Sequence, residues 1–214
     1  MKMLIRTLLI LLLTAAMPAL AFAEPVAYLS LRSEPGDFVG GGQSVDLMYR
    51  SPQDLIRAGV WRRFADGSPS LVAFDAWAPN AYATLLFGTH ELGIPLQPGT
   101  YTDAQRAPFA EPGHAGLDVS FQHRGSNTLW GSFTILEATF MRDDAGALQV
   151  RTFDALFSQR SEYQAPVLSG HFRYNAAGDD LAPVPEPGTM LLLGSGVAAL
   201  MVRYRRRGGT AAQG

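Results

Sequence analysis

Short stretches in which hydrophobic and polar residues alternate recur between residues 24 and 175, and turn-forming residues separate them. A period of two is typical of strands with one buried face, and Gly, Pro and Asn mark the turns between strands. Ser51 and Pro52 are an exception, because they suit the first residues of a short helical turn. We therefore predict an all-β domain over 24–175, built as a jelly-roll-like antiparallel β-sandwich. Its predicted strands cover 27–32, 44–49, 71–77, 83–87, 116–121, 131–140, 148–157 and 167–174.

The N-terminus carries a different pattern, a continuous apolar run over 8–16 that follows two basic residues. A basic start, an apolar run and a small-residue site are typical of a secretory signal peptide. The small residues Ala21 and Ala23 form that site, so signal peptidase would cut between Ala23 and Glu24. Residues 1–23 are therefore predicted to be a signal peptide. An uncleaved membrane anchor is the alternative, which the short apolar run disfavours.

A second apolar run, over 190–202, lies near the C-terminus and follows the motif Pro185-Glu186-Pro187. Proline fixes the backbone and cannot continue a helix, so the motif predicts an extended segment that ends where a helix begins. With its flanking residues the run predicts a transmembrane helix over 189–204. The run itself would measure about 20 Å as a helix, less than the hydrocarbon core of roughly 30 Å. This short span suits a transient anchor better than a permanent one.

A cluster of arginines follows the second apolar run. Basic residues next to a span stay in the cytoplasm, so this cluster would retain its end of the helix there. Residues 24–187 would then face the periplasm while the protein is in the inner membrane. The stretch 176–183 is predicted to be a linker, and 208–214 a disordered tail. The arginines of the cluster are Arg203, Arg205, Arg206 and Arg207.

The order of motif, apolar helix and arginines over 184–207 resembles the PEP-CTERM sorting signal of Gram-negative bacteria. The resemblance implies that exosortase, an integral-membrane enzyme, recognises Pro185, Glu186 and Pro187 and removes the tail. It also implies release from the cell or attachment to its surface, often in bacteria that make exopolysaccharide. An ordinary C-terminal membrane anchor is the alternative.

Charge and cysteine content narrow the classes of function open to the domain. Residues 24–183 hold 18 acidic side chains against 11 arginines, a net charge of −7 with neutral histidines. Such a surface argues against nucleic acid as a partner, because nucleic-acid binding needs a basic face. The chain has no Cys, which excludes thiol catalysis and Cys-ligated metal sites. Its four histidines do not pair at metal-ligand spacing, so we expect no metal and no cofactor.

Residues 24–175 also resemble an uncharacterised β-sandwich domain of secreted bacterial proteins, some of which carry the same sorting signal. Related sequences often have Cys in place of Ser126 and Ser161, so the resemblance implies that this chain has lost a disulfide between the two positions. It implies no activity. The segments that carry it are 28–43, 95–101, 106–109, 116–119, 124–134, 153–159 and 170–175.

Acidic residues in predicted strands are candidates for a catalytic pair, because glycosidases use two carboxyl groups roughly 5–10 Å apart across a groove. The alternative is that each acid caps a turn, pairs with an Arg or faces water. The candidates are Asp75, Asp118, Glu137 and Asp154.

Aromatic residues offer a second kind of site, because the apolar face of a sugar ring stacks on aromatic side chains. Trp130, Tyr101 and Tyr163 are the candidate glycan platform, since Trp130 adjoins a predicted turn. For each Trp of the chain, burial in the core is the alternative. Further aromatic candidates are Trp61, Trp77 and Tyr82.

These patterns predict an exported envelope or extracellular-matrix protein that exosortase sorts. Its domain would be non-catalytic, with a structural or adhesive role and exopolysaccharide as the expected ligand. A glycan-active hydrolase or lyase on the same fold is the alternative. After a transient stay in the inner membrane, the protein would reach the cell surface or the medium.

Overall fold

The computed structural model describes residues 24–162 and 166–176. This part of the chain is all-β, as predicted, and every predicted strand forms within a residue or a few of its expected bounds. Two further strands and a short 3₁₀ turn complete it. The elements are β1 (Val26–Ser33), β2 (Ser44–Arg50), β3 (Leu55–Arg63), β4 (Pro69–Ala78), β5 (Ala81–Gly88), η1 (His90–Leu92), β6 (Gly99–Arg106), β7 (Gly116–Phe121), β8 (Leu129–Arg142), β9 (Leu148–Ser161) and β10 (Leu168–Tyr174).

The predicted signal peptide (1–23), sorting signal (184–207) and tail (208–214) lie outside the described residues, as does most of the predicted linker. Within the described ranges no helix has the length and apolar character needed to cross a membrane.

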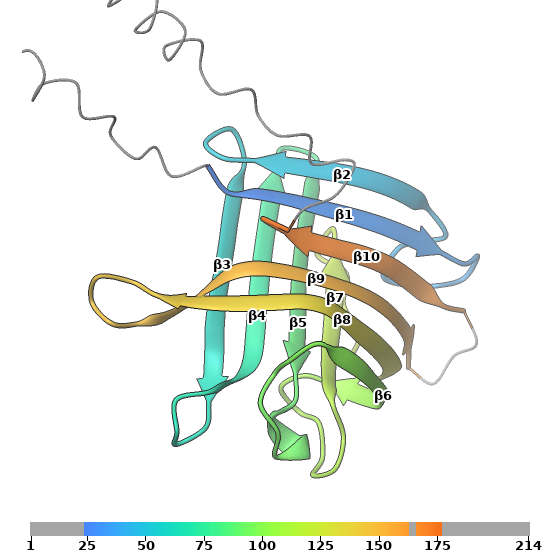
Figure 1. Cartoon of the computed structure of the whole chain (residues 1–214). Coiled ribbons are helices and arrows are strands. Elements are labelled where there is room, and N and C mark those ends of the chain that lie inside the picture. The colour runs from blue at the N-terminus through green and yellow to red at the C-terminus, as the bar shows by residue number, and fades with distance from the viewer. Residues whose placement is uncertain (1–23, 163–165, 177–214) are drawn as a thin grey trace, which may run out of the picture. The chain divides into compact units, whose positions relative to one another are not determined.

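All ten strands belong to one sheet, in the order β2-β1-β10-β9-β8-β6-β7-β5-β4-β3. Neighbours run antiparallel except β6 and β7, which pair in parallel through Gln105 and Arg106. The expected pair of antiparallel sheets is therefore wrong: the sheet is single and mixed. Figure 1 shows that it folds over, so that β2, β1, β10, β9 and β8 run across β3, β4, β5 and β7.

The connection between β2 and β3 explains why the sheet folds over. These two strands are its opposite edges, yet only residues 51–54 join them. The edges must therefore lie close together. The helical turn expected at Ser51 and Pro52 forms only as a single tight turn, in which the Asp54 N–H donates to the Arg50 carbonyl at 2.8 Å, before β3 begins at Leu55.

The core lies between the two halves of the folded sheet. Phe74 of β4 contacts Phe153 of β9 and Phe172 of β10, with ring centroids 4.9 and 4.8 Å apart. Phe87 of β5 adds a second contact to Phe153 at 5.1 Å. Aromatic packing of this kind is favourable beyond the area it buries, so the ring cluster fixes one half against the other.

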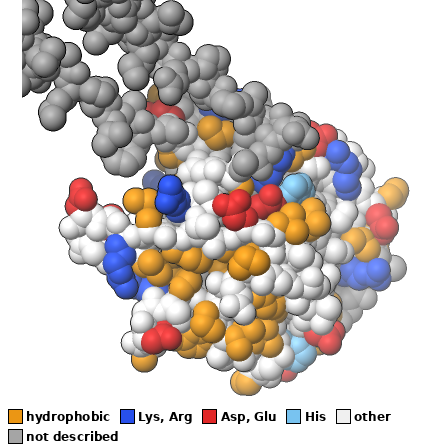
Figure 2. Space-filling view, in the orientation of Figure 1, with side chains coloured by type: hydrophobic (Ala, Val, Ile, Leu, Met, Phe, Trp, Pro, Cys, Tyr) orange, Lys and Arg blue, Asp and Glu red, His pale blue; other side chains and the backbone are white. Residues whose placement is uncertain are grey.

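The outer face of the sheet is less polar than strict alternation predicts. Figure 2 shows hydrophobic side chains gathered over β8 and β9 on the face turned to the viewer. Leu136, Met141 and Leu156 of these strands are among the exposed large hydrophobic residues. Scattered apolar side chains are normal on protein surfaces, and we assign them no site.

Candidate functional site

An exposed aromatic cluster forms where β4 ends and β5 begins. Trp77 and Tyr82 are register partners in these strands, with ring centroids 5.1 Å apart. The His123 ring stacks on Tyr82 at 4.9 Å and meets Trp77 edge-on at 6.3 Å. Trp77 is 51% exposed. Trp77, Tyr82 and His123, called the aromatic cluster below, thus present flat apolar rings to solvent.

A tight turn after β7 holds His123 in the cluster. Phe121 and Arg124 exchange backbone hydrogen bonds of 3.0 and 2.9 Å, and the backbone N–H of Gln122 donates to the Tyr82 carbonyl at 2.9 Å. Gln122 and His123 both have positive φ, +51° and +62°. That conformation is unfavourable for residues other than Gly and persists where surrounding contacts enforce it. The turn is therefore pinned to the β4–β5 hairpin and fixes the His123 ring.

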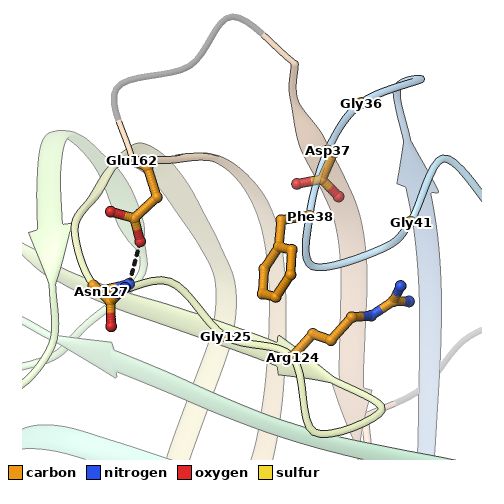
Figure 3. A pocket seen from close by; sticks show the side chains of 8 residues that line it. All are labelled: Gly36, Asp37, Phe38, Gly41, Arg124, Gly125, Asn127 and Glu162. Carbon is orange, nitrogen blue, oxygen red and sulfur yellow. Dashed lines mark hydrogen bonds between the residues drawn. The ribbon is translucent and has the colours of Figure 1, made fainter.

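A pocket of about 590 Å³ lies on the other side of this turn (Figure 3). Its walls come from the β1–β2 loop, the β7–β8 loop and the residue after β9. Phe38 stands at its mouth and is 59% exposed. The lining residues are Gly36, Asp37, Phe38, Gly41, Arg124, Gly125, Asn127 and Glu162.

Two carboxylates of the pocket hold its loops in place. Asp37 Oδ2 accepts hydrogen bonds from Ser33 Oγ and from the Gly40 N–H, both at 2.7 Å. Glu162 accepts from the backbone N–H groups of Asn127 and Thr128. The Asn127 N–H is the main reason that the pKa of Glu162 lies below its usual range. Each carboxylate therefore braces a wall of the pocket.

Arg124 is the only cation among the described residues that line this pocket. Its guanidinium makes no hydrogen bond or ion pair with a described residue, and Nε is buried without a partner there. The group lies against Gly41, where an added Cβ would come within 2.6 Å of Nη1. Gly41 thus leaves the space that the guanidinium occupies.

The residues of the predicted glycan platform differ in their surroundings. Tyr101 is 7% exposed, its hydroxyl donates to the Gln97 carbonyl at 2.8 Å, and its ring stacks on Phe133 in the core. Tyr101 is therefore wrong as a platform residue. Trp130 is half-buried, with its ring edge-on to His114 at 5.8 Å. Tyr163 lies outside the described residues.

The alternative of core burial is wrong for the two other tryptophans. Trp61 on the edge strand β3 is 59% exposed, and Trp77 is 51% exposed. Of these two, only Trp77 has aromatic neighbours among the described residues.

Glu137 and Asp154 are register partners across β8 and β9. Glu137 accepts a hydrogen bond from the Thr152 hydroxyl. An Asp154 oxygen lies 2.6 Å from His171 Nε2. Both carboxylates therefore have neighbouring partners on the same face of the sheet.

The other two candidate acids also have partners, and Asp118 has the Arg partner that the alternative expected. Arg106 Nε donates to Asp118 at 3.1 Å, and Thr84 Oγ1 donates to Asp75 at 2.8 Å. Burial raises the pKa of Asp118, and Arg106 partly offsets that effect. None of the four candidate acids lines the pocket of Figure 3. Across the described ranges, no three His, Asp or Glu side chains converge as a metal site would require.

Sequence reasoning missed His123, Arg124 and Phe38. The available signal was weak: a turn was expected at 124–127, but nothing in its composition separates a binding loop from a plain connection. Phe38 stands in a glycine-rich loop, where an exposed large ring has no packing role to explain it.

The geometry thus defines an all-β domain with an aromatic surface and an arginine-containing pocket on either side of one turn. In a comparison with protein families, residues 183–207 match the PEP-CTERM protein-sorting motif. This confirms the resemblance found at Pro185, Glu186 and Pro187, and implies an exported protein that exosortase sorts to the surface or the medium. Neither the curated proteins nor the solved structures contain a match to this chain.

Proposed function

We propose that the β domain is a non-catalytic adhesive module that holds the exported protein in exopolysaccharide. The observation that carries the proposal is the exposed aromatic cluster. A pyranose ring offers an apolar face of similar size to these rings, and stacking on them removes apolar surface from water. Trp77 and Tyr82 supply most of the aromatic surface. The turn at His123 fixes the arrangement of the rings before a ligand binds.

Rigid presentation favours binding, because little side-chain freedom remains to be lost when the ligand binds. His123 is stacked, and the backbone beside it is hydrogen-bonded to the β4–β5 hairpin. The surface is open rather than enclosed, which suits an internal stretch of a long polymer better than a small molecule.

We infer the export route of the protein from the signals at the two ends of its sequence. Signal peptidase removes 1–23 by cutting after Ala23. The arginines at 203–207 keep the tail in the cytoplasm while 24–187 faces the periplasm. Exosortase then acts at Pro185-Glu186-Pro187, and the domain reaches the envelope or the extracellular matrix.

Binding of the host's own purified exopolysaccharide to the exported, processed protein tests the adhesive role. We expect Trp77→Ala to weaken binding by tenfold or more, because it removes the largest ring of the cluster. Trp61→Ala is the matched control, since Trp61 is equally exposed but has no aromatic neighbour among the described residues. No binding by the wild type, or equal losses in the two variants, would contradict the proposal.

The non-catalytic part of the proposal rests on the partners of the four candidate acids. Its test is incubation of the protein with the same exopolysaccharide, followed by assays for new reducing ends and for unsaturated products. We expect neither. Reducing ends that the wild type releases and Glu137→Gln does not would favour a hydrolase instead.

A further inference from the structure

The Arg124 guanidinium has an unusual environment for an arginine. Its Nε is buried and has no hydrogen-bond acceptor among the described residues. A buried donor without an acceptor costs free energy, and arginine is almost never left in this state. Here the guanidinium also opens onto a pocket of about 590 Å³, so a ligand can supply what the protein does not.

We propose that this pocket binds the carboxylate of an acidic sugar unit, such as a uronic acid within a glycan. The inference rests on the proposed function, and it names the class of glycan. A guanidinium presents a planar fork of N–H donors that matches a carboxylate in two parallel hydrogen bonds. Arg124 is placed to make that pair.

The other lining residues favour a sugar over a simple anion. In Figure 3 the Phe38 ring, from the β1–β2 loop, points toward the Arg124 side chain, from the turn after β7. Phe38 is 59% exposed, so its ring becomes buried in this position only if a ligand covers it. A ring that stacks on Phe38 while its carboxylate meets Arg124 would use both features.

The two carboxylates in the pocket disfavour a single bound group that itself carries more than one negative charge. Asp37 and Glu162 bring two negative charges beside the one positive charge of Arg124. A phosphate or sulfate cluster would meet net repulsion, whereas a monocarboxylate is matched by the guanidinium. The lone pairs that Asp37 and Glu162 do not use can accept sugar hydroxyl groups.

The pocket and the aromatic cluster share one turn, because His123 and Arg124 are consecutive residues. A polymer with acidic and neutral units could therefore place its carboxylate on Arg124 and a neighbouring ring on Trp77 or Tyr82. The two sites would then recognise one chain, which raises affinity without further contacts.

Binding of the exported protein to polygalacturonate and to dextran tests this assignment. We expect the wild type to prefer polygalacturonate and Arg124→Gln to lose that preference by at least tenfold, with dextran binding unchanged. Arg124→Lys should recover only part of it, because lysine keeps the charge but not the fork. Arg63→Gln, the same charge change at the far end of β3, should match the wild type. A preference that Arg124→Gln retains would overturn the proposal.

Competition distinguishes a sugar site from a bare carboxylate site. Galacturonate should displace polygalacturonate at concentrations where acetate does not, and Phe38→Ala should weaken galacturonate binding. Equal competition by acetate would overturn the assignment to a sugar. Phe38 is exposed, so this variant should keep the wild-type melting temperature. Dextran binding that Trp77→Ala abolishes, without any preference of the wild type for polygalacturonate, would be a failure of this assignment and not of the adhesive role.

Discussion

A disulfide between positions 126 and 161 should form readily in this chain. Ser126 Oγ and Ser161 Oγ are 2.6 Å apart, and both residues are buried. The resemblance to secreted relatives implied Cys at these positions, and the structure now places the two side chains in contact. Disulfide geometry needs Cβ atoms about 3.5–4.5 Å apart, which hydroxyl groups in direct hydrogen-bond contact permit. We expect Ser126→Cys with Ser161→Cys to oxidise spontaneously during export.

The stabilisation can be worked from the length of the closed loop. The two positions are 35 residues apart, and the chain-entropy relation gives about 4 kcal/mol for a loop of that length. Loss of the buried Ser–Ser hydrogen bond lowers this stabilisation by about 1 kcal/mol. A net gain of about 3 kcal/mol corresponds to a rise in Tm of roughly 6–12 °C for a domain of this size.

Thermal unfolding with and without reductant measures the gain, and free-thiol titration reports whether the bridge is present. Ser126→Cys alone is the control, because it carries the packing change without a cross-link. The reasoning would be refuted by an oxidised double variant that melts no higher than its reduced form. Two free thiols after oxidation would refute the inferred geometry.

Two other variants test the loop and the core. The pKa of Glu162 is depressed in the folded state, so its carboxylate adds stability that is present above the unfolded pKa of about 4.5 and lost as pH falls through the folded pKa. The Tm difference between wild type and Glu162→Gln should therefore be steady from pH 7 to 5.5 and shrink below pH 4. A difference that grows on acidification would contradict this sign. Phe153→Ala should lower the free energy of unfolding by about 3–5 kcal/mol in urea titration, because Phe153 contacts both Phe74 and Phe87 across the core; a loss under 1 kcal/mol would mean that the two halves do not depend on this contact.

The sequence predicted the strands better than their arrangement. Alternating runs such as 27–32 follow from the need to bury one face, which is a local rule. The strand Gly99–Arg106 escaped notice because its side chains are mostly polar and its pairing with β8 is interrupted between Tyr101 and Ala104. The parallel pairing of β6 with β7 depends on where a long connection places its ends, and no local pattern encodes that.

The candidate site was harder to predict, because exposure of an aromatic ring depends on its neighbours across strands. Trp77 and Tyr101 both stand in strands, yet Trp77 lies at a strand end with one face open, whereas Tyr101 reaches inward to Phe133. The amino-acid composition around Trp77 and Tyr101 does not show which of the two rings is exposed. The importance of Arg124 follows only from its surroundings, since the sequence does not distinguish a fully exposed arginine from one whose Nε is buried without a partner.

Salt gives a last test of the Arg124 assignment, because local attraction and overall repulsion respond to it differently. The domain carries a net charge of −7, and a carboxylate at a distance of ~15 Å from its centre would be repelled by about 1.2 kcal/mol in 10 mM salt and about 0.3 kcal/mol at 150 mM. The contact with Arg124 spans only a few ångströms in a partly buried site, so screening weakens it by a few tenths of a kcal/mol. Binding of galacturonate should therefore strengthen by about threefold as salt rises from 10 to 150 mM. Calorimetric titration at the two salt concentrations measures the change, with Arg124→Gln as the control that binds weakly at both. Affinity that falls steadily with salt would show that diffuse cationic attraction, and not this single guanidinium, holds the acid.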